Sequence, residues 1–255
     1  MTTSPTQELL VLTLETARIA GLVVAAPLAW SEVPARVRGA FAFILALVAH
    51  RYGQGTEIHS AMGAAVAMAP EFMIGLAMGF VVRLSIAVVE IVGDAISPIM
   101  GLGAASLFDP HVQAQETGLT RILRMLTLLL AVLLGLHRVL VASVIASFRV
   151  LPPGSLANPA LATPALVRMS VDSLSLGLRL ALPILAVLIV TQLALAFVSR
   201  AAPSMQIFSI GFTITLIAGG LTLFATLPDL AMEIAADLSR VGTRIETVVA
   251  ALVPG

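Results

Sequence analysis

The stretch "SRAAPSMQIFSIGFTITLIAGG", residues Ser199–Gly220, joins two long apolar runs near the end of the chain. These runs, Leu176–Val198 and Ile207–Leu227, each have the roughly 20 residues that a helix needs to cross a bilayer. The connection Ser199–Gln206 has only eight residues, and so short a connection places consecutive helices side by side and antiparallel. The stretch therefore predicts a helical hairpin.

Two residues in this stretch favour an end to the first helix. Arg200 lies at its C-terminal end, where a cation is favourable beside the partial negative charge of the helix dipole. Pro203 disfavours helical geometry at the residue before it. We therefore expect the first helix of the hairpin to end just before Pro203.

The composition is that of a membrane protein. Of the 255 residues, 59% are hydrophobic and 11% are charged, whereas an ordinary soluble domain has about 25% charged residues. The 14 basic residues are all arginine, and the formal net charge is zero. The absence of cysteine excludes a disulfide scaffold and a thiolate metal site, and without a basic stripe the chain has no sign of nucleic-acid binding.

Ionisable side chains interrupt the other apolar runs. The remaining runs of spanning length are Leu9–Trp30, Ala61–Val82 and Met125–Phe148, and a shorter run covers Gly39–Ala49. The ionisable residues within the three long runs are Glu15, Arg18, Glu71, His137 and Arg138. Because a charge at the centre of a bilayer is costly, these faces must lie against protein or water. We expect Glu71, Arg83 and Arg138 to find their counterions on other polypeptides.

Small residues recur every fourth position around Glu71. Gly63, Ala67, Gly75 and Gly79 would share one helix face with it, and such a ridge lets a second helix approach closely. An Ala- and Gly-rich chain could produce this spacing by chance, so the charge of Glu71 is the stronger signal.

Three segments differ from the apolar runs. Gly93–Gly118 mixes Gly, Ser, Pro and Asp with isolated apolar residues, which predicts a loop or broken helix. Arg149–Ser170 contains four prolines, which predicts an extended connector without chemistry. From Pro228, apolar residues recur at three- and four-residue steps, which predicts an amphipathic helix with Pro228 at its first position. That helix would lie on its own protein, at the headgroup level or against a partner.

Motifs for catalysis and metal binding are absent from the sequence. The four histidines have no acid at metal-ligand spacing, and no nucleophile elbow or phosphate-binding glycine motif occurs. We expect no enzyme activity, no cofactor and no metal. Two alternative functions remain open. One is a small proton-coupled transporter in which Glu71 and Asp94 carry protons, and the other is a membrane-anchored scaffold without a conduit.

Four stretches together resemble the FliR/SctT family of type III export gate proteins. Ser199–Gly220 resembles the C-terminal signature of the family, although Ser204, Gln206 and Thr213 depart from it. The other three resemble its N-terminal Arg/Gly/Pro pattern, its glycine-rich segment ending in Asp-Pro, and its histidine-containing helix before a proline-glycine loop. They are "RIAGLVVAAPLAWSEVPARVR" from Arg18, "GDAISPIMGLGAASLFDP" from Gly93 and "GLHRVLVASVIASFRVLPPGS" from Gly135. All four occur in the order of the family and cover most of the chain.

The resemblance implies an all-α, membrane-type fold of helical hairpins over one domain, residues 1–255. Residues 1–170 would be FliP-like, and residues 171–255 would form a FliQ-like hairpin with an amphipathic C-terminal helix. The implied partners are FliP-like, FliQ-like, FlhB-like and FlhA-like proteins, unfolded flagellar proteins in export, and membrane lipid. The implied location is the bacterial inner membrane, in the flagellar basal body. The motif around Phe208 favours the flagellar form over an injectisome SctT homologue.

The resemblance also implies site residues. It maps a pore plug onto Met100, Gly101, Leu102, Gly103, Leu107, Phe108, Asp109 and Pro110. We expect the two glycines to let this segment bend, and its apolar side chains to seal the pore. The residues that we expect to act in assembly or structure are Arg18, Glu71, Arg83, His137, Arg138, Arg200, Pro203 and Phe208.

Overall fold

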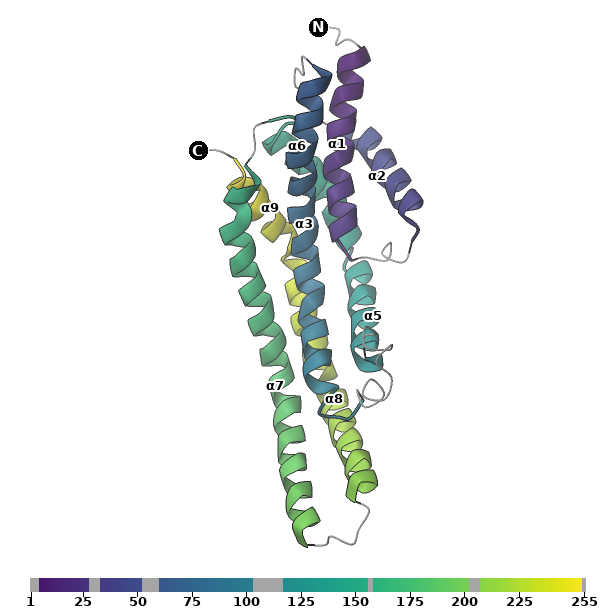
Figure 1. The fold of residues 1–255 in the computed structure, drawn as a ribbon, viewed down its shortest axis with the longest axis vertical. Helices are drawn as coiled ribbons and strands as arrows, with labels where there is room; N and C mark the ends of the chain where they lie inside the picture. The colour runs from purple at the N-terminus through teal and green to yellow at the C-terminus, as the bar shows by residue number, and fades with distance from the viewer. Residues whose placement is uncertain are drawn as a thin grey trace. The chain divides into compact units, whose positions relative to one another are not determined.

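Helices make up nearly all of the described structure, which is a computed structural model (Figure 1). It describes residues 5–27, 33–51, 60–102, 117–155, 158–201 and 207–253. Within these ranges there is no β-strand, so the predicted all-α fold is confirmed. The chain divides into two units, each assembled from separate stretches of sequence.

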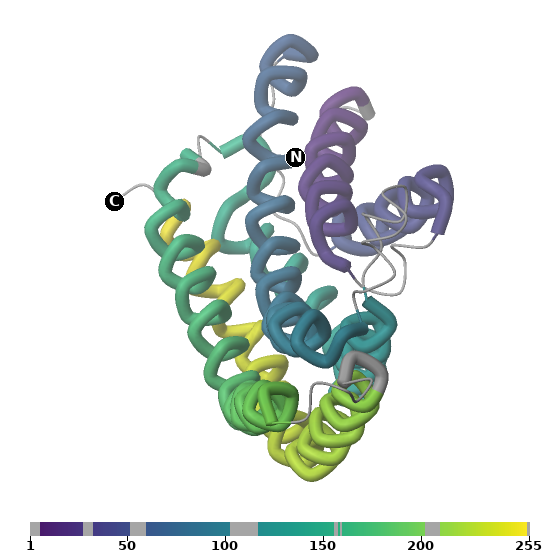
Figure 2. The backbone as a smooth tube through the Cα atoms, turned by 60° about the horizontal axis from the view of Figure 1, so that its bottom comes forward, coloured from purple at the N-terminus to yellow at the C-terminus, as the bar shows by residue number. Residues whose placement is uncertain are grey.

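The first unit combines Met1–Ser85, Ala131–Val171 and Asp237–Gly255. Its helices are α1 (Pro5–Ala25), α2 (Ala35–His50), the first part of α3 (Ala61–Ile96), α6 (Leu136–Val150), the 3-10 turn η3 (Pro159–Ala162) and α9 (Val241–Ala251). In both views α1 lies between α2 and α3 (Figures 1 and 2). This unit contains the most deeply buried charges, Glu15, Arg18 and Glu71.

The second unit combines Ile86–Leu130 and Asp172–Ala236. It holds the end of α3, most of α5 (Gly118–Leu133), and the greater parts of α7 (Thr163–Ala201) and α8 (Ile207–Ser239). α7 and α8 run antiparallel (Figure 1), as the stretch Ser199–Gly220 predicts.

Three helical stretches are long and apolar enough to cross a membrane, and a fourth span is possible if α5 and α6 act as one. The three stretches are Ala61–Ile96, Ala160–Ala201 and Ile210–Ala251. α1 is not among them, although its apolar run has the length of a span, because three ionisable residues, Glu8, Glu15 and Arg18, lie along it.

The structure corrects four expectations from the sequence. α3 continues to Ile96, so the predicted loop begins later than Gly93. The run Met125–Phe148 is two helices, α5 and α6, bent by 64°. α8 passes through Pro228, which lies inside the helix instead of at its first position. The predicted connector after Arg149 is partly helical, because η3 leads directly into α7.

The amphipathic pattern after Pro228 is confirmed, although it covers two helices, the end of α8 and α9. Its apolar positions are all buried within the chain, which favours packing on its own protein over the alternatives. They are Leu230, Ile234, Leu238, Val241, Ile245, Val248 and Leu252. Arg240 separates the two helices, and α9 begins at Val241.

Candidate functional site

α1 and α3 approach so closely that glycine is required at their contact. A Cβ atom at Gly75 would clash with the backbone carbonyl of Arg18, and a Cβ atom at Gly21 would clash with the carbonyl of Phe72. At Gly79 a Cβ atom would lie 2.7 Å from the carbonyl oxygen of Leu22. The predicted ridge of small residues is thus confirmed from Glu71 to Gly79, while Gly63 is exposed at the start of α3.

This close approach brings Arg18 and Glu71 together. Arg18 Nε donates to Glu71 Oε2 over 2.6 Å, and the two side chains are 0% and 3% exposed. Arg18 Nη1 donates to Ser147 Oγ over 3.1 Å. The guanidinium also lies 4.6 Å from the ring centroid of Phe148, a favourable cation–π geometry.

The second oxygen of Glu71 is also occupied. The backbone N–H of Gly154 donates to Glu71 Oε1 over 2.9 Å. The expectation that Glu71 needs a counterion from another polypeptide is therefore wrong, because Arg18 of the same chain supplies it. The connector Arg149–Ser170 contributes structurally, since its turn at Gly154 donates this hydrogen bond.

A second buried acid, Glu15, lies one helical turn from Arg18. Its Oε2 is 3.0 Å from Nδ1 of His50, the last residue of α2. Glu15 is 1% exposed, and its burial raises the pKa of the carboxyl, while His50 and Arg18 act in the opposite direction. The pair ties the end of α2 to the middle of α1.

These contacts make a fixed structural cluster. Glu71 accepts a charged hydrogen bond on one oxygen and a backbone hydrogen bond on the other, and it is 2% exposed. Both oxygens of Glu71 are therefore already hydrogen-bonded within the chain, which does not favour the transporter alternative. The cluster joins α1, α3, α6 and the turn at Gly154. The sequence alone does not place Ser147 and Gly154 in this cluster.

The start of the glycine-rich segment is held at three points in the second unit. Met100 is 3% exposed, and a Cβ atom at Gly219 of α8 would lie 2.9 Å from it. Gly101 has a φ of +78° beneath the ring of Phe212, a conformation that glycine adopts without strain. Gln192 Nε2 of α7 donates to the carbonyl of Ile99 over 3.3 Å.

A chain of hydroxyl groups joins the two ends of this segment. Ser97 Oγ donates to the carbonyl of Gly93 over 2.6 Å and lies 2.8 Å from Thr117 Oγ1. Thr117 Oγ1 lies 2.8 Å from Thr120 Oγ1, which donates to Asp94 Oδ1 over 2.9 Å. Residues 97 and 117 are therefore fixed beside each other. We refer to Asp94, Ser97, Thr117 and Thr120 as the hydroxyl clasp.

The remaining predicted residues are distributed more widely. Arg83, His137, Arg138 and Arg200 are exposed on α3, α6 and α7, and the expected contact of Arg138 with another polypeptide stays a prediction. Met100, Gly101 and Leu102 belong to the described foot of the predicted plug. The residues that lie outside the described ranges are Gly103, Leu107, Phe108, Asp109, Pro110 and Pro203, and the same holds for the side chain of Phe208.

The described residues contain no group of three or more His, Cys, Asp or Glu residues that could hold a metal ion. The hydroxyl clasp has a single carboxylate, and in the cluster around Arg18 the two acids contact an arginine and a histidine. Both arrangements organise backbone segments, and neither presents a cofactor site.

The comparison with known families matches residues 9–241 to Bacterial export proteins, family 1. The chain belongs to this family. The matched region includes the buried Arg18–Glu71 pair, the hydroxyl clasp and the α7–α8 hairpin. The FliR/SctT resemblance of the sequence is confirmed.

Curated relatives of this export-protein family support the assignment. The flagellar biosynthetic protein FliR of Caulobacter vibrioides is 30% identical over 85% of this chain and 88% of its own length. FliR of Escherichia coli is 35% identical over 63% of this chain and 62% of its own length. FliR of Bacillus subtilis is 26% identical over 76% of this chain and 77% of its own length.

Proposed function

We propose that this chain is a subunit of the flagellar protein export apparatus in the bacterial inner membrane, without catalytic activity. It would form part of the channel wall and part of the plug that closes the pore. The observation that carries this proposal is the family match over residues 9–241, together with relatives named as flagellar biosynthetic protein FliR. Three helical stretches that could cross a membrane are consistent with a membrane-bound subunit.

The α7–α8 hairpin supports a role in a larger assembly. Bulky apolar side chains are widely exposed on both of its helices. They include Leu182, Phe197, Leu221 and Phe224, which are 60%, 73%, 65% and 76% exposed. So many exposed apolar side chains require lipid or protein to cover them. FliP-like, FliQ-like, FlhB-like and FlhA-like proteins are the partners that we propose, and unfolded flagellar proteins are the cargo.

The described start of the glycine-rich segment supports the assignment of a plug. Met100 and Gly101 are held against α8, and the hydroxyl clasp fixes both ends of the segment. A segment anchored at its ends can close a pore and still bend between the anchors. In the closed state, Leu102, Leu107 and Phe108 would contribute apolar contacts.

Ion leak through the assembled apparatus tests the plug. We expect deletion of residues 101–107 to increase conductance across membranes that contain the complex. A deletion of the same length at residues 52–58 controls for shortening the chain and should leave conductance unchanged. Unaltered conductance in the first variant, with normal complex yield, would remove this segment from the seal.

Co-purification tests membership of the apparatus separately. We expect the affinity-tagged chain to retain FliP-like and FliQ-like proteins when all are expressed together, and to be unstable when expressed alone. A stable, monodisperse chain that moves a solute across liposomes without partners would contradict the proposal.

A further inference from the structure

A helix on a protein core usually buries its bulky apolar side chains. α2 does the opposite. Its buried residues are alanines, Ala42, Ala46 and Ala49, which are 1%, 0% and 1% exposed. Their spacing of four and three places them on one helix face, and this face lies against the rest of the first unit. α2 therefore buries its smallest side chains.

The opposite face of α2 carries its bulky apolar side chains. Val37, Phe41, Ile44 and Val48 follow the same four- and three-residue spacing and are 55%, 42%, 60% and 48% exposed. We call these four residues the α2 stripe. An exposed apolar stripe of this kind is unfavourable in water, so a further component must cover it.

The charges at the two ends of α2 indicate what kind of molecule covers the α2 stripe. Arg36 and Arg38 lie in its first turn, Arg51 follows its last residue, and the helix contains no acid. Among the described residues none of these arginines forms an ion pair. Cations at both ends of an apolar helix are typical of a helix whose arginines reach lipid headgroups.

The length of α2 supports an interfacial position. Its 16 residues give a helix of about 24 Å, which is shorter than the roughly 30 Å hydrocarbon core. The helix also lies outside the stretches that could span a membrane. A short apolar helix with basic ends lies in the headgroup region, with its apolar face toward the acyl chains.

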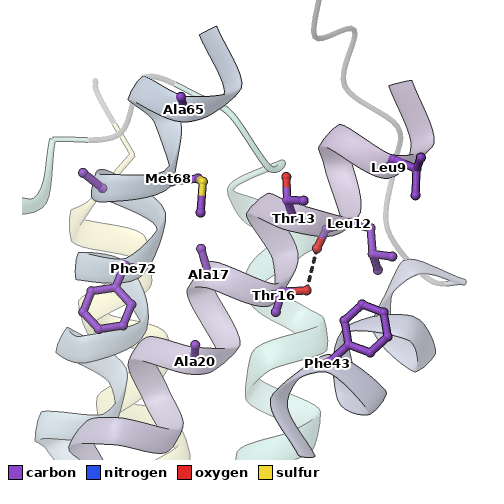
Figure 3. Close-up of a pocket in the computed structure, with 11 residues that line it drawn as sticks. Leu9, Leu12, Thr13, Thr16, Ala17, Ala20, Phe43, Ala65, Met68 and Phe72 are labelled. Atoms are coloured by element: carbon purple, nitrogen blue, oxygen red, sulfur yellow. Dashed lines mark hydrogen bonds between the residues drawn. The ribbon is translucent and has the colours of Figure 1, made fainter. Parts of the chain in front are cut away.

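An apolar groove lies beside α2 (Figure 3). It has a volume of about 780 Å³, and Phe43 of α2 lines it together with residues of α1 and α3, among them Leu12 and Met68. The hydroxyls of Thr13 and Thr16 also line it, but they donate to the carbonyls of Leu10 and Leu12 within α1. The groove thus offers an acyl chain apolar contacts and no unsatisfied donor.

We infer that α2 is a lipid-binding element of this chain and that its ligand is an anionic phospholipid. The acyl chains cover the α2 stripe and enter the groove beside Phe43, and the headgroup phosphate binds Arg36 and Arg38. The positive charge and the absence of acids on α2 favour this ligand over a neighbouring protein. The inference concerns a different surface from the plug and does not depend on it.

Photo-crosslinking from the α2 stripe tests the inference. The full chain, expressed with its export partners, carries p-benzoylphenylalanine in place of Phe41 and is irradiated in native membranes. Mass spectrometry then identifies what is attached to residue 41. We expect a phospholipid adduct enriched in phosphatidylglycerol relative to its share of the membrane. If this variant does not accumulate, the same reporter replaces Ile44.

Charge variants test the headgroup contact. We expect Arg36→Gln/Arg38→Gln to lower the enrichment in phosphatidylglycerol, by about fivefold for each arginine that reaches the surface. Arg36→Lys/Arg38→Lys retains the charge and should retain the enrichment. Arg149→Gln/Arg168→Gln removes two exposed arginines of the same unit and should also retain it.

Two outcomes overturn the inference. A crosslink from residue 41 to another polypeptide, including a second copy of this chain, without a lipid adduct would show that protein covers the stripe. A lipid adduct whose composition follows that of the membrane in every charge variant would exclude binding of an anionic headgroup by the arginines.

Discussion

The cluster around Arg18 and the hydroxyl clasp both hold separate segments of the chain together, but with different polar groups. Both join segments that are distant in the sequence. In the first, a guanidinium and a carboxylate are enclosed and hydrogen-bonded on several sides. In the second, three neutral hydroxyls lead to Asp94, which is exposed.

The two differ in the free energy that is needed to separate their hydrogen-bonded groups. Separating a buried ion pair leaves a charge without a partner in a low-dielectric environment, which is strongly unfavourable. Separating two hydroxyls loses about 1 kcal/mol per hydrogen bond, and water can replace the lost partner. We therefore regard the Arg18 cluster as permanent structure and the hydroxyl clasp as a connection that can open during function.

We expect the largest effect from a substitution in the Arg18 cluster, which we regard as permanent structure. Glu71→Leu leaves Arg18 buried without its counterion, which should destabilise the chain by about 3 to 5 kcal/mol. We expect loss of the assembled complex, measured as its yield from membranes, before any change in export rate. Glu246→Leu, which changes an exposed acid of the same unit, is the control. Normal complex yield with slowed export in Glu71→Leu would contradict a structural role for the pair.

A smaller effect tests the close approach beneath the pair. Gly75→Ala introduces a Cβ atom that overlaps the carbonyl of Arg18, and such overpacking costs about 1 to 3 kcal/mol. Gly220→Ala on α8 places a Cβ atom where no atom lies within 4 Å, so it should preserve stability. Thermal unfolding of the purified complex would compare the two variants. Equal midpoints would mean that α1 and α3 can move apart without cost.

The hydroxyl clasp should respond more weakly but with a specific readout. Thr120→Val removes its hydrogen bonds with Asp94 and Thr117, a loss of about 1 kcal/mol for each bond. We expect faster hydrogen exchange near residue 117 and a raised ion leak, with normal assembly. Thr127→Val changes an equally buried threonine that donates only to Leu123 of its own helix. If both variants leak equally, the clasp has no special part in closing the pore.

The smallest expected effect concerns Glu15. Burial raises its pKa above the ordinary value of 4.5 in the folded chain, so folding favours its protonated form. Its contribution to stability is therefore greatest below that value and is lost as the pH rises through the folded pKa. Unfolding experiments across this pH range would compare the native chain with Glu15→Gln. We expect the free energy of unfolding of the variant to rise relative to that of the native chain as the pH increases. An unchanged difference at every pH would show that Glu15 does not titrate there.

The sequence predicted the local structure better than the contacts. The hairpin, the apolar runs and the amphipathic end depend on local spacing, which the sequence displays directly. The pair Arg18–Glu71 spans 53 positions, and no local pattern links the two residues, so the sequence does not indicate that the counterion of Glu71 lies in the same chain. The burial of Ser147 could have been inferred, because it shares a helix face with Leu140, Val144 and Phe148.

Pro228 and the glycine-rich segment show a second limit of prediction from the sequence. Pro228 has the signature of a helix start, yet α8 continues through it from Ile207 to Ser239. The hydroxyls of Ser97 and Thr117 lie 20 positions apart, and only the fold around the end of α3 brings them together. Most of the plug implied by the resemblance remains a prediction, since Gly103, Leu107 and Phe108 lie outside the described ranges.

The bond between Glu71 and Gly154 has a consequence for biosynthesis. These residues are separated by 83 positions, and bacterial ribosomes add about 5 to 20 residues per second. For about 4 to 17 seconds after Glu71 is made, the nascent chain lacks the turn that completes its coordination. We expect the N-terminal helices to be most open to degradation or mispairing during this interval, before Gly154 can bind Glu71.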